Sequence, residues 1–385
     1  MNARVAELQG CRVAELQGCS GSKLTGDRTG RAGEKVAADE RSFQLPPSYH
    51  CNSATLQLLV KAGALTVCLF FASCGNSRTP LVIYSPHGRE LLSLVERRFE
   101  ALHPGVDVRW LDMGSQEVLD RVRSERANPQ ADLWFGGPTP LFARAVRDSL
   151  LEPATPGGPL YLSVYRTPAV IEFNSVAVPE SLAPADWDDV LAPRWKDKLL
   201  IRDPLASGTM RAIFEMVMMR SLARTGDTTA GWAWLRRLDA QTGDYVQNPA
   251  LLHVKLERQE GLISLWDLPD MLLLQHEGRK FGYHFPTSGT PVIDDAIAVV
   301  RGARHAALAR EFVRWVLTPE MQLVAAREAF RLPARTDLPA DSLPQWVRDV
   351  DARMRVEPVN WDTVEAHGAA WMDYWDRHVR GTGKK

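Results

Sequence analysis

Apolar residues follow two different spacings in the segment that begins near residue 80. Residues 81–84 form a continuous apolar run of strand type, and residues 106–111 and 131–135 predict two further strands. Between these runs, apolar residues recur at helical spacing over 91–99 and again over 118–124. A strand, helix, strand, helix, strand order with short loops predicts a parallel, right-handed α/β sheet.

The remainder of the chain predicts a second group of strands and helices and then a helical end. Extended chain is expected over residues 160–174 and 281–303, the first interrupted by Pro168 and the second by a turn at 286–291. The other predicted elements are a short helix at 187–191, a turn at 193–196, strands at 199–201 and 262–265, and helices that begin near 208, 249, 307 and 320. Tryptophans of the tail at helical spacing indicate packing.

A short apolar stretch that ends in small residues, LTVCLFFASC, occupies residues 65–74. A stretch of this kind is typical of an export signal with an apolar core at about 62–73, and it is too short for a membrane span. Small residues directly before Cys74 resemble a bacterial lipobox, in which the cysteine becomes the lipidated first residue of the mature protein. A buried helix and a plain cleaved signal are the alternatives.

The residues before this stretch lack a hydrophobic period. Residues 4–11 are repeated at 12–19, and the segment up to residue 55 has too few apolar residues in periodic positions to bury a core. We therefore interpret residues 1–73 as a disordered leader or an over-extended reading frame followed by a lipoprotein signal peptide, with translation starting near Val60. A genuine cytoplasmic leader is the alternative.

Composition excludes several classes of protein for the mature part. All five cysteines of the chain lie at or before Cys74, so no disulfide framework and no thiolate metal site is expected after it. The chain carries 46 Lys and Arg against 47 Asp and Glu with no basic block, which argues against a nucleic-acid partner.

Small and polar residues follow three of the predicted strands. These residues lie at 85–88, which include His87 and Gly88, at Gly114 and Ser115, and at Gly136 and Gly137. Ligands of parallel α/β sheets bind beyond the carboxyl ends of the strands, so the pattern predicts a cleft there. His87 can instead cap or line the cleft without touching a ligand.

The segment Ser207-Gly208-Thr209, between a strand and a helix, is the best candidate binding element. A serine or threonine caps such a helix, the glycine permits close approach, and the free N–H groups of the first turn suit a phosphate, sulfate or carboxylate. An ordinary helix cap with nothing bound is the alternative. Asn248 repeats the capping pattern, and Trp266 and Asp267 end another strand, where Trp266 can equally be part of the core.

No enzyme signature accompanies these elements. The chain has no His-Glu-x-x-His, Gly-x-Ser-x-Gly, Walker or dinucleotide-binding motif, and nothing in the sequence supplies a base for Ser207. We expect a protein that is not an enzyme and needs no cofactor.

Five segments occur in an order that resembles a known family: Tyr84–Gly88, Ala131–Trp134, Trp187–Pro204, Ser207–Thr209 and Thr290–Asp295. Over residues 80–335 they resemble the extracellular solute-binding proteins of bacterial ABC importers, in the branch that contains the ferric-ion-binding proteins.

The resemblance implies a two-lobed α/β fold of the type II periplasmic-binding-protein class. Each lobe is a mainly parallel sheet flanked by helices, and two crossing strands near 164–173 and 286–297 join the lobes, which close on the ligand by hinge motion. The implied parts are lobe one at 80–168 with 293–340, lobe two at 169–292, and a C-terminal helical extension at 341–385 that packs on lobe one.

The iron-binding relatives use a histidine, a glutamate and a tyrosine pair as ligands. His87 matches the histidine, but the other positions correspond to Gly137 and to Trp266-Asp267, so the resemblance does not carry an iron site. If a metal takes part, His87 and Asp267 are its expected ligands.

The expected function is capture of a small anionic solute, namely a phosphorylated, phosphonate or carboxylate compound. The expected ligand-binding residues are His87, Gly88, Ser115, Gly136, Ser207, Gly208, Thr209, Asn248, Trp266 and Asp267. The alternatives are a ferric-iron-binding component and a binding lobe that serves a sensor. The expected partners are an ABC permease and a bacterial membrane, reached from the periplasm or the cell surface through lipidated Cys74, and a monomer is expected.

Overall fold

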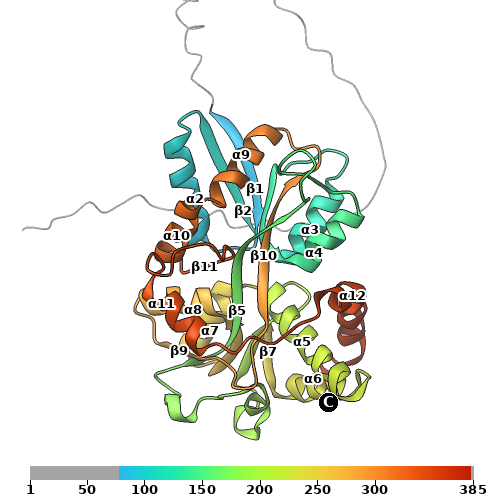
Figure 1. Ribbon diagram of the computed structural model, residues 1–385. Helices are drawn as coiled ribbons and strands as arrows, with labels where there is room; N and C mark the ends of the chain where they lie inside the picture. The colour runs from blue at the N-terminus through green and yellow to red at the C-terminus, as the bar shows by residue number, and fades with distance from the viewer. Residues whose placement is uncertain (1–77, 383–385) are drawn as a thin grey trace, which may run out of the picture. The chain divides into compact units, whose positions relative to one another are not determined.

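The computed structural model describes residues 78–382 of the chain. By its internal contacts the chain divides into one unit at Met1–Ser73 and a second at Cys74–Lys385. The predicted signal peptide and Cys74 lie outside the described residues. The second unit contains two α/β lobes (Figure 1).

Lobe one starts with the predicted alternation of strands and helices. Its elements are β1 (Thr79–Ser85), α2 (Arg89–Leu102), β2 (Val106–Asp112), α3 (Ser115–Ser124), β3 (Leu133–Pro138), α4 (Thr139–Arg147) and β4 (Leu151–Glu152). Strands β2, β1 and β3 are parallel neighbours in that order, which confirms the predicted parallel sheet. Gly136 and Gly137, which were expected to end the third strand, are part of β3 at φ values of 101° and 100°.

Lobe two repeats the parallel arrangement. Its elements are η1 (Glu180–Leu182), η2 (Trp187–Leu191), η3 (Pro193–Trp195), β6 (Leu199–Arg202), α5 (Gly208–Thr225), α6 (Thr229–Gln241), β7 (Thr242–Val246), α7 (Pro249–Glu257), β8 (Ile263–Asp267), α8 (Leu268–His276) and β9 (Phe281–His284). Strands β8, β6 and β7 run parallel. All residues of β6 and β8 are buried, because helices cover both faces of a parallel sheet, and this explains their continuous apolar sequences.

Two segments cross between the lobes, as the resemblance implied. Strand β5 (Leu162–Asn174) pairs antiparallel with β10 (Val292–Val300) through residues 162–168, and with β8 and β9 through residues 169–174. Figure 1 shows β5 and β10 side by side where they leave the upper lobe. The three parallel strands of each lobe are thus completed by antiparallel crossing strands.

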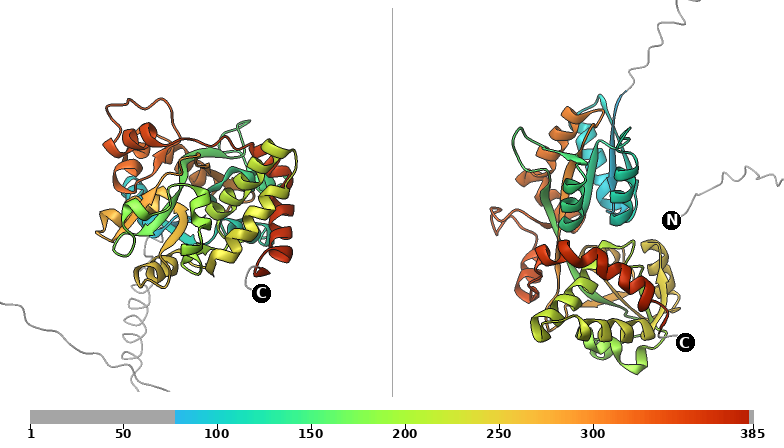
Figure 2. Two further views of the ribbon diagram at one scale, coloured as in Figure 1. Left: turned by 90° about the horizontal axis from the view of Figure 1, so that it is seen from below. Right: turned by 90° about the vertical axis from the view of Figure 1, so that its right-hand side faces the viewer.

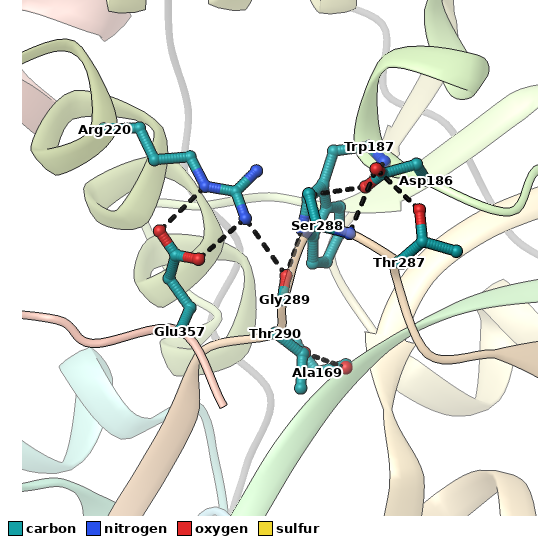
Figure 3. A network of polar contacts seen from close by, with 9 residues as sticks. All are labelled: Ala169, Asp186, Trp187, Arg220, Thr287, Ser288, Gly289, Thr290 and Glu357. Carbon is teal, nitrogen blue, oxygen red and sulfur yellow. Dashed lines mark hydrogen bonds and ion pairs between the residues drawn. The ribbon is translucent and has the colours of Figure 1, made fainter. Parts of the chain in front are cut away.

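The second crossing segment, which precedes β10, is held by the lobe-two side (Figure 3). Asp186 accepts hydrogen bonds from the Thr287 hydroxyl and from the Ser288 amide and hydroxyl, and the indole of Trp187 donates to the Gly289 carbonyl at 2.8 Å. These bonds satisfy the polar groups of the predicted turn at residues 286–291 and fix its course across lobe two.

The C-terminal part returns from lobe one to lobe two. Its elements are α9 (Ala306–Val316), α10 (Pro319–Glu328), β11 (Leu332–Pro333), α11 (Gln345–Arg353) and α12 (Trp361–His378). Helices α9 and α10 belong to lobe one: Phe312 and Met321 are in the same core as β1 and β3.

Residues 341–382 contact both lobes, whereas the sequence led us to expect packing on lobe one. Lobe-one contacts are present: Arg147 of α4 pairs with Glu365 of α12, and the Trp346 indole of α11 donates to the Ala326 carbonyl of α10. Trp371 and Trp375 of α12 are part of the lobe-two core beside Phe214 of α5, and Val347 of α11 packs with Trp266. Figure 2 shows α12 along the helices of lobe two. Most residues of α5 are buried, including Arg211 and Glu215, and the tryptophans of α12 pack in the same core cluster as its Met210, Ile213 and Phe214.

Candidate functional site

A cavity of about 550 Å³ lies between the lobes, beside the crossing strands. Its walls come from the loops that follow β1, β2 and β3 of lobe one and β6, β7 and β8 of lobe two. These loops follow the carboxyl ends of parallel strands, which is where ligands of such sheets bind.

The structure brings nine of the ten expected ligand-binding residues to this cavity. The nine residues that line it are His87, Gly88, Ser115, Ser207, Gly208, Thr209, Asn248, Trp266 and Asp267. Gly136 is not among the lining residues: a Cβ atom built on it would lie 2.4 Å from Nε2 of His87, so this glycine makes room for the histidine ring.

The N-terminus of α5 opens on the cavity with free amide groups. The hydroxyl of Ser207 caps the helix by accepting from the Met210 amide at 3.3 Å, which leaves the amides of Gly208 and Thr209 without a partner inside the helix. Gly208 is needed because a Cβ atom here would lie 2.9 Å from Oγ of Ser115 and 2.9 Å from the Pro138 ring, both in lobe one.

Four more helix N-termini reach the same cavity. The residues that precede these helices, all of which line it, are Gly88 for α2, Gly114 for α3, Asn248 for α7 and Asp267 for α8. Each terminus carries a partial positive charge and unpaired amide hydrogens. Helix N-termini of this kind can bind anions, and the cavity is lined by carboxylates and guanidinium groups as well.

His87 is a buried residue of the cavity wall. Its ring meets the Phe135 ring edge-on at a centroid distance of 5.0 Å, and its Nε2 atom is buried without a hydrogen-bond partner. Burial, and then the nearby Arg331 guanidinium, hold the pKa of His87 well below its usual value, so the ring is neutral at pH 7. A neutral imidazole contributes shape and one hydrogen bond, but no charge.

Trp266 is both a cavity residue and a core residue. Its indole N–H donates to the Asp270 carboxylate at 3.0 Å, and its ring packs with Leu268 and Met271. The Arg202 guanidinium lies over the ring, 5.6 Å from its centroid. Trp266 therefore lines the cavity and is also part of the lobe-two core, and its contact with a ligand stays a prediction.

Asp267 and Asp270 form an acidic end of the cavity. The Asp267 carboxylate caps α8 by accepting from the Asp270 amide at 3.1 Å. Burial raises the pKa of Asp267 well above its usual value, and the neighbouring Asp270 carboxylate raises it further. A cation placed here would relieve both effects.

Two buried arginines of the cavity were missed by the sequence analysis. Arg202 ends β6 directly before the candidate turn, so its position at a strand end was an available signal. Arg331 is 5% exposed, its Nε atom has no partner, and its nearest carboxylate oxygen, on Asp270, is 3.7 Å away. Nothing in the local sequence points to Arg331, because it reaches the cavity only through the left-handed turn at Phe330, where φ is 51°.

A third cavity residue that the sequence analysis missed is Asp295. Its carboxylate accepts from the Gly137 amide at 2.8 Å and from the Thr167 hydroxyl, so it ties β10 to β3 and β5. It follows a predicted turn in an extended segment, and sequence alone does not distinguish it from a surface carboxylate.

The donor set does not form a metal centre. Among residues 78–382, no group of three or more His, Cys, Asp or Glu side chains is placed to hold a metal ion, and the lining residues include no tyrosine. At the position of the relatives' glutamate, Gly137 has a φ of 100°, and a Cβ atom there would lie 3.1 Å from Ser115. A glutamate there would be strained by this backbone conformation and would crowd Ser115.

Within the same described range, no helix combines the length and the hydrophobicity that a bilayer crossing requires. This finding concerns the two lobes and the C-terminal helices.

Comparison with known proteins gives consistent matches. A family model described as bacterial extracellular solute-binding protein matches residues 81–331. A probable ABC transporter periplasmic-binding protein from Sinorhizobium fredii is 23% identical, and the match covers 86% of this chain and 94% of that protein. A putative 2-aminoethylphosphonate-binding periplasmic protein from Salmonella typhimurium is 25% identical, with 71% of this chain and 83% of the relative covered.

A solved structure has the same fold. The periplasmic binding protein AfuA from Actinobacillus pleuropneumoniae, with exogenous fructose-6-phosphate bound, superimposes with a TM-score of 0.68 at 20% identity. The superposition covers 79% of this chain and 99% of AfuA.

Proposed function

Because the chain belongs to the family of bacterial extracellular solute-binding proteins, we propose that its cavity captures a small anionic solute for an ABC importer. The solute class is a phosphonate, a phosphate ester or a carboxylate. Hinge motion about β5 and the segment before β10 closes the lobes on the solute and presents the closed form to a permease.

The observation that carries this proposal is the N-terminus of α5. The unpaired amides of Gly208 and Thr209, together with the Thr209 hydroxyl, are suited to an oxyanion. Ser115 of lobe one lies against the same turn, so an anion held there has donors from both lobes. An anion that contacts both lobes favours the closed form, because only that form provides all of its hydrogen bonds.

The acidic end of the cavity suits a second group on the same solute. An ammonium or a hydroxyl group beside Asp267 and Asp270 would pair with carboxylates that otherwise repel each other. A small molecule with an acidic group at one end and an amine or hydroxyls at the other fits both ends. The ligands in the names of the two relatives, 2-aminoethylphosphonate and fructose-6-phosphate, have this character.

Two alternatives make different demands on the cavity. Direct binding of Fe(III) needs hard oxygen ligands such as phenolates, and the residues that line the cavity provide no tyrosine. Service to a sensor instead of a transporter leaves the cavity unchanged and differs only in the protein partner. We therefore retain the importer component, acting as a monomer without enzymatic activity, as the proposed function.

We also propose that the mature protein is held on a bacterial membrane, in the periplasm or at the cell surface, by a lipid on Cys74. The support is the sequence before that residue, an apolar stretch closed by small residues. Expression of the full chain in a bacterium grown with labelled palmitate should label the protein and place it in the membrane fraction. Cys74→Ser should lose both; label that persists in this variant would exclude Cys74 as the anchor.

The proposal on the solute is tested by thermal stabilisation of residues 75–385. The panel contains 2-aminoethylphosphonate, sugar phosphates, other phosphonates, thiamine, polyamines, and Fe(III) with and without citrate. A ligand at 100 times its dissociation constant adds about 2.7 kcal/mol of stability, which corresponds to a shift of a few degrees in Tm.

We expect a shift with an organic anion, and loss of that shift in Ser207→Ala/Thr209→Ala because both hydroxyls of the turn are removed. Ser93→Ala on α2, away from the cavity, is the matched control. A shift with Fe(III) alone would overturn the anionic solute in favour of iron.

A further inference from the structure

The segment that follows α12 reaches back to the turn that presents the α5 amides. Arg380 lies two residues beyond the helix and pairs with Asp203, which is 4% exposed and stands directly after β6. The family match ends at residue 331, so this arginine is contributed by a part of the chain outside the matched segment.

Asp203 organises the turn from residue 203 to residue 207. Its carboxylate accepts from the Leu205 amide at 2.9 Å, and its main-chain carbonyl accepts from the amides of Ala206 and Ser207 at 3.1 and 2.9 Å. Three successive amides therefore have their acceptors on this one residue. The position of Ser207, and with it the direction of the first amides of α5, depends on where Asp203 is held.

The same carboxylate also reaches the second helix terminus of lobe two. Its Oδ2 atom accepts from Nε2 of Gln247 at 2.6 Å, and Gln247 lines the cavity one residue before the Asn248 cap of α7. One aspartate thus joins the loops that lead into α5 and α7.

Arg380 is the cation that faces this aspartate. Its guanidinium also pairs with Asp376 at 2.9 Å and lies over the rings of Trp375 and Tyr245, 5.0 and 5.4 Å from their centroids. The rings restrict the side chain, and the two carboxylates fix its orientation. A guanidinium held in this way acts as a rigid hydrogen-bond donor.

We propose that Arg380 is a positioning residue of the solute site. It holds Asp203 in place, and through Asp203 it fixes the α5 turn and Gln247 in the arrangement that receives the anionic group. The inference rests on the proposed function for its effect on affinity, but its effect on the turn is independent of any ligand.

A purely structural role is the competing explanation, in which Arg380 only anchors the tail to lobe two. That role predicts a lower Tm when Arg380 is changed, with no selective effect on residues 205–207. Tm alone therefore does not separate the two, and a residue-specific measurement is needed.

The test measures amide hydrogen exchange of the unliganded protein for Leu205, Ala206 and Ser207. Arg380→Met retains most of the packing against the rings but loses the charge and the donors. We expect exchange of these three amides to rise by about tenfold, because loss of a charge-assisted bond frees Asp203. Arg380→Lys should give a smaller rise, since it keeps the charge without the planar fork.

Arg377→Met is the matched control. It removes an arginine of the same helix end, whose pair with Asp373 is more than half exposed on both sides. Exchange of the three amides should stay at the wild-type rate in this variant. Equal exchange in Arg380→Met and wild type would overturn the inference, whatever happens to Tm.

Affinity gives a second measurement, with 2-aminoethylphosphonate and inorganic phosphate as probes. For a probe that wild type binds, Arg380→Met should raise the Kd by about tenfold. In the double variant, it should add little to the rise in Kd caused by Asp203→Asn. Fully additive losses would contradict action through Asp203. If wild type binds neither probe nor any anion of the panel, the proposed function fails, whereas the exchange result still decides the role of Arg380.

Discussion

Arg331 is a buried arginine that lines the cavity. A buried guanidinium with an unpaired Nε atom is unfavourable in the empty protein, because its lost hydration is only partly replaced. An anionic solute supplies what is missing. The residue before Arg331, Phe330, has a left-handed φ of 51°, and Arg331 lines the cavity directly after this turn.

At this scale we predict that Arg331→Met lowers affinity for the solute by roughly tenfold or more, the size typical of a charge-assisted hydrogen bond. The Tm of the unliganded protein should not fall, since the variant removes an incompletely paired buried charge. Calorimetric titration and thermal unfolding measure the two effects. Arg335→Met, on the exposed pair with Asp337, is the control, and an unchanged Kd in Arg331→Met would refute the prediction.

Glu215 gives a prediction for pH. This residue of α5 is 5% exposed and faces Gly368 of α12, and burial raises its pKa to about 8 although Arg211 and Arg144 oppose the shift. In the unfolded chain the carboxyl titrates near 4.5. Between these two values the folded state binds the extra proton, so stability falls as pH rises.

We therefore expect the Tm of Glu215→Gln, relative to wild type, to increase from pH 5 to pH 8 and to level off above that. In wild type, this carboxyl group lowers the free energy of unfolding by at most about 1.4 kcal/mol for each unit that the pH rises. Differential scanning calorimetry at four pH values measures it. Parallel Tm curves for the two proteins would show that Glu215 is ionised in the folded state.

At the scale of elements, residues 355–357, which follow α11, form hydrogen bonds with the second crossing segment at Thr290. The Thr290 amide donates to the Arg355 carbonyl at 2.8 Å, and the Glu357 amide donates back to the Thr290 carbonyl at 2.7 Å. The Glu357 carboxylate then forms two bonds of 2.9 Å with Arg220 of α5, which also donates to the Gly289 carbonyl (Figure 3). These bonds fix Gly289 and Thr290 of the crossing to α5 and to the segment that follows α11.

We predict that Glu357→Gln lowers the free energy of unfolding by about 1 kcal/mol, because it breaks a bidentate pair that is mostly shielded from solvent. Urea unfolding measures the change. Glu328→Gln breaks the exposed pair with Arg98 and should change stability by less than about 0.5 kcal/mol. If the two variants lowered stability equally, the pair of Glu357 with Arg220 would have no special role in holding the crossing.

At the scale of the whole two-lobed unit, small residues lie where the two lobes meet. Gly114 of lobe one lies against Ala206 of lobe two, and a Cβ atom on Gly114 would be 2.7 Å from the Ala206 carbonyl oxygen. Backbone atoms cannot yield as a flexible side chain does. The approach of the α3 terminus to the α5 turn therefore requires a glycine here.

We predict that Gly114→Ala weakens solute binding by about tenfold without a loss of Tm in the unliganded protein, because alanine suits the φ of −60° and obstructs only the closed contact. Titration gives the affinity, and small-angle scattering should show less compaction on adding solute. Gly105→Ala, where nothing lies within 4 Å of the added Cβ, is the control. Wild-type affinity in Gly114→Ala would refute the role of this contact.

Much of the fold follows from local sequence. The apolar runs at β6 and β8 reflect burial of both faces of these strands, and that pattern is visible without a structure. Ser207 and Asn248 cap their helices as predicted, since capping involves atoms only three residues apart. The α/β class and the loops that line the cavity were therefore determined by the sequence itself.

Long-range contacts decided the rest. Arg331, Asp295 and Arg380 act on partners that are distant in the chain, and no period or cap marks them. The C-terminal helix α12 packs its tryptophans against α5 of lobe two and pairs Glu365 with Arg147 of lobe one, and neither contact is visible in the sequence of the tail. Hydrophobic periodicity fixes which face of a helix is buried, whereas only tertiary packing decides what buries it.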